Sequence, residues 1–161
     1  MTDLRHNSGV TLVEMLVVLS IIIVLSGITV TLTRRVDNQS KENGLRNAFA
    51  LVGSSLREYY EFKGQFPPQA ERNAANALTH VEFMVQELRL VPASRQVLDK
   101  VSASLIKADS TSAGVQFLCD PWGTVVDYIY APGNDTFPEL ISAGPDRLFG
   151  TGDDISSKGK P

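Results

Sequence analysis

The sequence contains very little of what metal centres and hydrolytic enzymes are built from. Cys119 is the only cysteine among 161 residues, so an internal disulfide and a multi-cysteine metal site are both excluded. Because it ends the apolar run VQFLC, we interpret it as a small buried hydrophobic side chain rather than a reactive thiol. The only histidines, His6 and His80, supply too few ligands or partners for a zinc site or a Ser/His/Asp triad. We therefore expect a protein that is not an enzyme.

The chain also lacks an excess of charge of one sign. Its net charge is -3, and acidic and basic residues are interleaved without long runs, so nothing predicts binding to nucleic acid. A phosphate-binding glycine loop, an HExxH motif and a GxSxG motif are absent too. With 43% hydrophobic residues, the length allows one modest domain beside a membrane segment.

A long apolar run near the N-terminus is the most prominent feature that is present. No charged residue occurs between Met15 and Thr33, and about 20 apolar residues are enough for a helix to cross a bilayer. The run is longer than the core of an ordinary signal peptide, and no small-x-small cleavage pattern follows it. The sequence therefore predicts a retained membrane helix. Glu14 stands at its edge, where a carboxylate is costly unless it has a partner.

Helical spacing continues beyond the apolar run. Apolar residues recur at steps of three and four, the period of one helix face: Leu45, Phe49, Val52, Leu56, Tyr59 and Tyr60. No proline lies between Val10 and Gly64, so the membrane half and the amphipathic half can form one helix that ends at about residue 63. Residues 74–107 keep a mostly helical pattern with a break at Pro92. They predict an insert of two short helices.

The last third of the chain changes to strand-forming segments. VQFLC and VVDYIY are rich in β-branched and aromatic residues, and the turn DPWG at residues 120–123 lies between them, which predicts an antiparallel hairpin. A third strand, FPELIS, precedes the glycine-rich acidic segment AGPDRLFGTGDDI, so the sheet and an acidic loop occupy residues 115–155. The expected fold class is α+β, with a long N-terminal helix packed on a small antiparallel sheet and a short helical insert.

The N-terminal residues resemble a known export signal. Gly9, the stretch TLVEML with Glu14 five residues after the glycine, and the long apolar run are similar to the class III signal of type IV pilins and of the pseudopilins of type II secretion systems. In that family a membrane peptidase cuts after the glycine on the cytoplasmic side and methylates the new N-terminus. The resemblance implies cleavage between Gly9 and Val10 and methylation of Val10.

The same resemblance implies an organisation and a role for Glu14. Residues 1–9 would be a cleaved leader, residues 10–33 the membrane and filament-core helix, and residues 34–161 a periplasmic pilin-like domain. Cleavage creates a cationic amine in an apolar environment, and the Glu14 carboxylate of a neighbouring subunit would offset it. Glu14 would thereby act in assembly. The alternative is an acid that merely reaches toward the membrane surface.

The C-terminal third resembles one member of the family in particular. DPWG, a strand and then ISAGPDRLFGTGDDI are similar to the major pseudopilin of type II secretion systems, whose C-terminal loop binds calcium. Acids separated by glycines can turn carboxylate and backbone oxygens inward, as a calcium ion with six to eight oxygen ligands requires. The resemblance implies these ligands: Asp146, Asp153, Asp154 and Ser142 by their side chains, and Leu140 and Ile141 by their carbonyls. The alternative is a solvated acidic loop.

The function implied is that of a structural subunit of a type II secretion pseudopilus, held in the bacterial inner membrane with its C-terminal domain in the periplasm. The implied partners are further copies of the chain, minor pseudopilins, the prepilin peptidase, the inner-membrane assembly platform and membrane lipid. The main alternative is a subunit of a type IV pilus or DNA-uptake filament. A membrane-tethered binding module with an uncut N-terminus is a second alternative, and an enzyme is the weakest.

Overall fold

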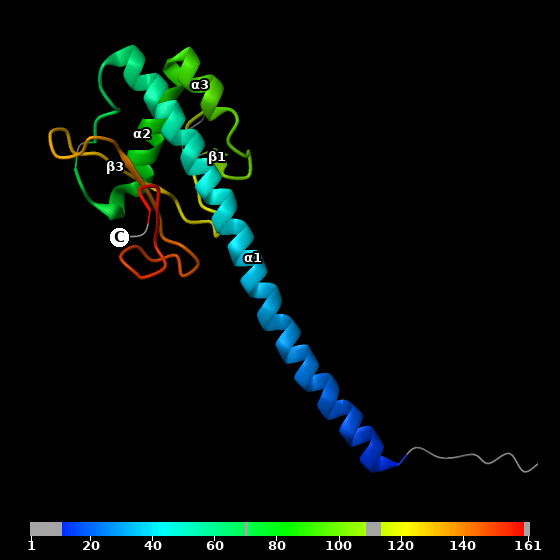
Figure 1. Ribbon diagram of the computed structural model, residues 1–161. Coiled ribbons are helices and arrows are strands. Elements are labelled where there is room, and N and C mark those ends of the chain that lie inside the picture. The colour runs from blue at the N-terminus through cyan, green and yellow to red at the C-terminus, as the bar shows by residue number, and fades with distance from the viewer. Residues whose placement is uncertain (1–10, 70, 109–113, 160–161) are drawn as a thin grey trace, which may run out of the picture. The chain divides into compact units, whose positions relative to one another are not determined.

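The first part of the chain forms helices, and the remainder forms short β-strands. The computed structural model describes residues 11–69, 71–108 and 114–159, without the side chains of residues 27–35. The elements are α1 (Leu12–Lys63), the 3-10 helix η1 (Ala74–Asn76), α2 (Ala77–Leu90), α3 (Pro92–Leu98), β1 (Ile106–Ala108), β2 (Gln116–Leu118), β3 (Asp127–Ile129), β4 (Glu139–Ser142) and β5 (Ile155–Ser156) (Figure 1). The expected α+β class is confirmed.

Helix α1 covers 52 residues and confirms the helix predicted to end at about residue 63. Thr11 stands before its first turn, where the Glu14 N–H donates to Thr11 Oγ1 at 3.2 Å, the usual bond from a helix N-cap to the third helical residue. Gly64 ends it with φ 73°, and its N–H donates to the Tyr60 carbonyl at 2.7 Å. This left-handed conformation is one that glycine adopts without strain.

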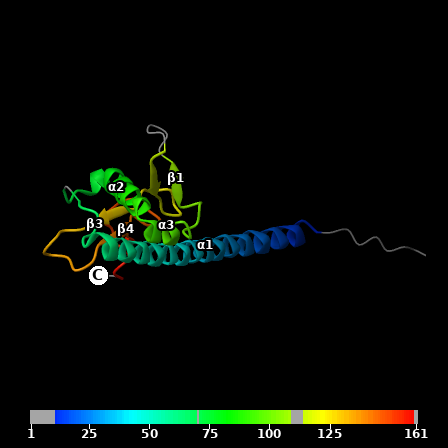
Figure 2. The same ribbon diagram turned by 90° about the horizontal axis from the view of Figure 1, so that it is seen from above.

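The hydrophobic core lies within the compact unit Ser40–Pro161, the second of two units into which the chain divides. Figure 2 shows α2, α3 and the strands gathered along one side of residues 40–63 of α1. The face predicted from the apolar spacing is buried at Leu45, Phe49, Val52, Leu56 and Tyr59. Tyr60 is the exception at 46% exposed, because it covers the edge of this core with its ring 4.7 Å from that of Phe66.

Polar side chains inside the core join α1 to the two shorter helices. The Ser55 hydroxyl donates to the carbonyl of Ser94 on α3 at 2.8 Å, and both serines are fully buried. The Tyr59 hydroxyl donates to Glu87 on α2 at 2.5 Å, and burial together with this carboxylate raises the pKa of the Tyr59 phenol. These bonds satisfy groups that would be costly to bury alone.

Helix α2 is joined to β3 by a buried pair of titratable side chains. His80 Nδ1 lies 3.0 Å from the Asp127 carboxylate, and both side chains are at most 5% exposed. Gln69 approaches the same ring nitrogen at 3.1 Å while its amide oxygen accepts the Tyr130 N–H at 2.8 Å. The segment before η1 is therefore held against both α2 and β3.

The strands form two antiparallel sheets, and the predicted hairpin is confirmed only next to its turn. β1 pairs with β2, and a separate sheet has the order β3-β4-β5. The segments VQFLC and VVDYIY are linked across the DPWG turn by the bridge Cys119↔Val125. The Asp120 N–H donates to the Thr124 carbonyl at 2.8 Å, and the Val126 N–H donates to the Leu118 carbonyl at 3.0 Å. Beyond Val126 the ladder changes partner, because Asp127 pairs with Ile141 of β4. The predicted hairpin is therefore limited to the residues beside the turn.

The insert predicted at residues 74–107 is helical only in its first part. η1, α2 and α3 end at Leu98, with Pro92 in the first turn of α3 as expected for a helix start. Residues after Leu98 turn, and Ile106 pairs with Leu118 as part of β1. The apolar residues read as a continued helix thus belong partly to a strand. β5 was not predicted at all, because two residues carry no recognisable period.

The only cysteine has the environment expected from its neighbours. Cys119 is 1% exposed, and burial raises the pKa of its thiol. The interpretation as a small hydrophobic core residue is confirmed.

Two leucines on α2 provide a matched test of the core. Leu88 is fully buried and Leu90 is 67% exposed. We expect Leu88→Ala to lower the free energy of unfolding by about 3 kcal/mol, because it leaves a cavity, and Leu90→Ala to change it by less than about 0.5 kcal/mol. Urea unfolding of the full chain in detergent, followed by Trp122 fluorescence, measures both. Equal effects would contradict the described packing of α2.

Candidate functional site

The N-terminal candidate residues are only partly within the described chain. Gly9 and Val10, the predicted cleavage site, lie outside the described residues. Glu14 lies in the first turn of α1, where the helix dipole favours a negative charge. Its side chain is exposed and makes no hydrogen bond or ion pair with any described residue. The carboxylate is thus available to a partner outside this chain.

The start of α1 carries an uncovered apolar surface. From Leu12 to Leu25 its large apolar side chains are exposed by between 46% and 81%, and they occur on all sides of the helix: Leu12, Val13, Met15, Leu16, Val17, Val18, Leu19, Ile21, Ile22, Ile23, Val24 and Leu25. Globular proteins rarely expose contiguous apolar surface of this size unless something covers it.

Part of the predicted membrane segment, residues 10–33, lies outside the residues that the structure describes. Val10 and the side chains of residues 27–33 are not described. Among the described residues, no helix is long and apolar enough to cross a membrane.

The acidic residues of the C-terminal segment lie together in one loop between β4 and β5. The Asp153 carboxylate accepts the N–H of Asp146 at 3.0 Å, Asp146 accepts the N–H of Leu148 at 2.8 Å, and Asp154 accepts the N–H of Gly150 at 2.8 Å. Each carboxylate therefore faces backbone N–H dipoles of the loop itself, which partly offset the repulsion among three like charges.

Two of these carboxylates have properties that suit a cation ligand. The Thr151 hydroxyl donates to Asp153 Oδ1 at 2.5 Å, and this bond holds the pKa of the Asp153 carboxyl below its ordinary value of 3.8. Asp153 is thus ionised at neutral pH. Asp154 Oδ1 is buried and has no hydrogen-bond partner within the described residues. A buried oxygen of this kind is unfavourable unless a donor or a cation reaches it.

The base of the loop is fixed by Asp120, which is 3% exposed. Asp120 Oδ2 accepts the Ser142 hydroxyl at 2.7 Å, and Ser142 Oγ in turn accepts the Gly144 N–H at 3.1 Å. Asp120 Oδ1 accepts the N–H groups of Trp122 at 3.0 Å and Thr124 at 2.8 Å. One buried carboxylate thus fixes both the DPWG turn and the point at which the acidic loop leaves β4.

The remaining predicted ligands lie on β4. Leu140, Ile141 and Ser142 belong to this strand, and the Leu140 carbonyl already accepts the Ser157 N–H at 2.9 Å. Within the part of the chain that the structure describes, no three His, Cys, Asp or Glu side chains lie close enough to hold a metal ion as they stand. Calcium binding stays a prediction.

A family model matches the N-terminal part of the chain. The model is described as the prokaryotic N-terminal methylation motif, and it matches residues 4–30. This range contains Gly9, Val10, Glu14 and most of the apolar run. The chain is a type IV pilin-like protein. The motif implies processing by a prepilin peptidase and assembly into a filament. No curated protein and no solved structure matches the chain.

In this pilin-like protein, Asp120 is the residue whose importance the sequence did not reveal. Aspartate is a common first residue of a turn because its carboxylate accepts the N–H two residues on, and DPWG was interpreted accordingly. The bond to Ser142 joins residues 22 positions apart. No local pattern encodes such a contact.

Two glycines of the pilin-like protein test the loop geometry. Gly144 has φ 66°, and a Cβ there would lie 2.2 Å from the Asp153 carbonyl oxygen, a distance that forces the backbone to move. Gly150 has φ 86° with no atom within 4 Å of an added Cβ. We expect Gly150→Ala to cost about 1 kcal/mol from backbone strain alone and Gly144→Ala to cost at least about twice that. Urea unfolding measures the difference, and equal costs would contradict the close approach of Asp153.

Proposed function

We propose that this pilin-like protein is a structural subunit of a type II secretion pseudopilus. The observation that carries the proposal is the uncovered apolar surface of α1 from Leu12 to Leu25, which lies within the methylation motif. Lipid tails cover such a surface before assembly, and like helices cover it in a filament. Before assembly the protein would lie in the inner membrane. The domain that follows the apolar part of α1 would lie in the periplasm.

The proposed assembly step uses the charge of Glu14. After cleavage, the amine of Val10 is a cation near the apolar surface, and the Glu14 carboxylate of the neighbouring subunit neutralises it. A buried charge is tolerated chiefly when it is paired, so the pair would set the register between successive subunits. An assembly platform and minor pseudopilins would add subunits, and the growing filament would push folded substrates toward the outer membrane.

The secretion role, rather than a pilus or DNA-uptake role, is supported by the C-terminal half. The acidic loop between β4 and β5 follows a DPWG turn, as in the major pseudopilins that the sequence resembles. The single buried cysteine leaves no disulfide of the kind that many pilins carry. These features favour a pseudopilus subunit. A pilus subunit is the alternative that the experiment below must exclude.

Glu14→Gln tests the proposed function in cells that produce the full chain with its secretion system. Because the variant keeps Gly9 and the apolar run, we expect cleavage after Gly9 by mass spectrometry and normal recovery in membranes. Incorporation into sheared filaments should fall at least tenfold, since an unpaired amine would be buried at each contact. Secreted proteins should accumulate in the periplasm. Glu71→Gln, an exposed acid elsewhere, is the matched control.

Three results would contradict this proposal. Normal incorporation of Glu14→Gln would remove the assembly role of Glu14. Loss of surface fibres with intact secretion would assign the protein to a pilus. An uncut wild-type N-terminus in the presence of the peptidase would identify a membrane-tethered module.

We further propose that the acidic loop binds calcium. The donor set fits a hard cation, since Asp146, Asp153 and Asp154 supply carboxylate oxygens. The buried, unpartnered Asp154 Oδ1 supports the proposal, as does the close approach of the Asp153 carbonyl to Gly144, which leaves no room for a side chain. Calcium would neutralise the loop's negative charge and fix the end of the β3-β4-β5 sheet, with carbonyls of Leu140 and Ile141 and the Ser142 side chain as the further predicted ligands.

Thermal unfolding of the chelator-treated full chain tests the metal proposal. Calcium at 100 times its dissociation constant should add about 2.7 kcal/mol, which raises Tm by several degrees. The double variant Asp153→Asn/Asp154→Asn should not respond, whereas Asp99→Asn, an exposed acid on another segment, should respond as wild type does. No rise in Tm with millimolar calcium, or an equal rise in the double variant, would contradict calcium binding.

A further inference from the structure

The acidic loop between β4 and β5 begins at a fully buried serine. Ser142 is the last residue of β4, and it pairs with Ile155 of β5. Its hydroxyl donates to Asp120 Oδ2 at 2.7 Å, and its oxygen accepts the Gly144 N–H at 3.1 Å. Within the described residues no other donor reaches this oxygen. Because a hydroxyl oxygen has two lone pairs, one lone pair of Ser142 Oγ stays available.

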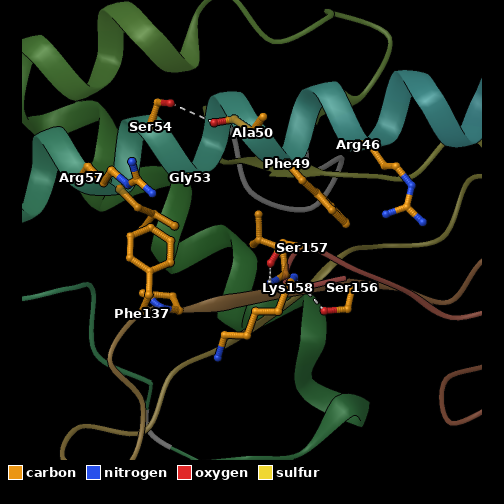
Figure 3. A pocket seen from close by; sticks show the side chains of 13 residues that line it. Arg46, Phe49, Ala50, Gly53, Ser54, Arg57, Phe137, Ser156, Ser157 and Lys158 are labelled. Atoms are coloured by element: carbon orange, nitrogen blue, oxygen red, sulfur yellow. Dashed lines mark hydrogen bonds between the residues drawn. The ribbon is translucent and has the colours of Figure 1, made fainter. Parts of the chain in front are cut away.

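The other end of the acidic loop is held by different groups. The Ser157 N–H donates to the Leu140 carbonyl at 2.9 Å, and Ser157 Oγ accepts the Leu140 N–H at 2.9 Å. The Ser156 hydroxyl donates to Glu139 at 2.6 Å. Figure 3 shows the side chains of Ser156 and Ser157 at this end. The bond to Asp120 therefore concerns the start of the loop, and its effect can be tested separately.

Gly144 connects Ser142 to two of the proposed calcium ligands. The Asp153 carbonyl approaches Gly144 so closely that a Cβ has no room there. The carboxylate of Asp153 in turn accepts the Asp146 N–H at 3.0 Å. A continuous set of contacts thus runs from Asp120 through Ser142 and Gly144 to both acids. If the start of the loop moved, Asp153 and Asp146 would move with it.

We propose that Asp120 is a positioning residue for calcium. By accepting the hydrogen bond of the Ser142 hydroxyl, it leaves a lone pair of Ser142 Oγ for the ion and holds the start of the acidic loop. The proposal rests on the calcium binding proposed above and adds a residue that does not itself touch the ion. Groups that hydrogen-bond to metal ligands orient them and raise their basicity, and losing such a group typically weakens metal binding about 10–100-fold.

Asp120→Asn keeps the size of the side chain but reverses one hydrogen bond. The amide oxygen can still accept the N–H groups of Trp122 and Thr124, whereas the amide nitrogen that faces Ser142 is a donor. Ser142 Oγ then accepts from this amide and from the Gly144 N–H, so neither lone pair is left for the ion. We expect the calcium Kd to rise at least about tenfold. Isothermal titration calorimetry of the chelator-treated full chain in detergent measures it.

Ser142→Ala tests whether Asp120 acts through the serine. This variant should also raise the calcium Kd at least about tenfold. In the double variant Asp120→Asn/Ser142→Ala, the Kd should stay within about twofold of that of Ser142→Ala alone, because the two residues act in series. Increases in Kd that multiply in the double variant would show that Asp120 acts by another route and would overturn the proposal.

Ser55→Ala is the matched control for general loss of stability. Ser55 is as fully buried as Ser142, and its hydroxyl donates to the Ser94 carbonyl on α3 at 2.8 Å. The control loses a comparable buried hydrogen bond, yet its calcium Kd should stay within about twofold of wild type. Circular dichroism at the titration temperature establishes that each variant is folded. If Asp120→Asn does not fold, Ser142→Ala against Ser55→Ala carries the test, and equal Kd values in these two would overturn the proposal.

Deuterium exchange of the calcium-free chain tests the hold on the loop without the ion. Peptides covering residues 143–154 should exchange faster in Asp120→Asn and Ser142→Ala than in wild type and Ser55→Ala, because the start of the loop is released. Unchanged exchange, or an unchanged Kd in Asp120→Asn, would overturn the positioning role and leave calcium binding intact. If wild type binds no calcium but exchange rises in both variants, calcium binding fails with the lone-pair step, whereas the hold of Asp120 on the loop stands.

Discussion

The buried carboxylate of Asp120 controls the arrangement of the C-terminal third of the chain. It accepts two backbone N–H groups of its own turn and the hydroxyl of Ser142 on β4. Each of these donors would cost about 1–3 kcal/mol if it were buried without an acceptor. The DPWG turn and the start of the acidic loop therefore depend on one side chain. The acidic loop can be glycine-rich and highly charged because the bond from Ser142 to Asp120 holds its first residues in place.

The features that sequence predicted well are those encoded locally. The extent of α1 follows from helical spacing without proline and from Thr11 and Gly64 at its ends, and Pro92 marks the break between α2 and α3. Strand pairing is not encoded in this way. The segments that contain β2 and β3 flank a turn and pair only beside it. Along its length β2 pairs with β1, inside the apparent helical insert, and β3 pairs with β4. The two residues of β5 are recognised as a strand only because they pair with β4.

The same division applies to the candidate sites. The signal around Gly9 and Glu14 is contiguous, so sequence alone was enough to find it, and the family model matches the same residues. The three loop aspartates are also close in sequence, and the structure brings them into one loop. Ser142 was expected to face a cation but bonds to Asp120, a contact over 22 residues. A cavity between α1 and the C-terminal strands is lined by both Arg57 and Lys158, which are 101 positions apart, and no sequence pattern marks a surface made of such distant segments.

The buried thiol of Cys119 bears on how this protein can change compartments. A pilin-like subunit is made in a reducing environment and works in an oxidising one. Its single sulfur is covered by the core and its pKa is raised, so little of the reactive thiolate forms in either environment. The folded unit needs no oxidase or isomerase and has the same covalent structure on both sides of the membrane. Its stability must then come from packing and hydrogen bonds, which form without any change in the covalent structure of the unit.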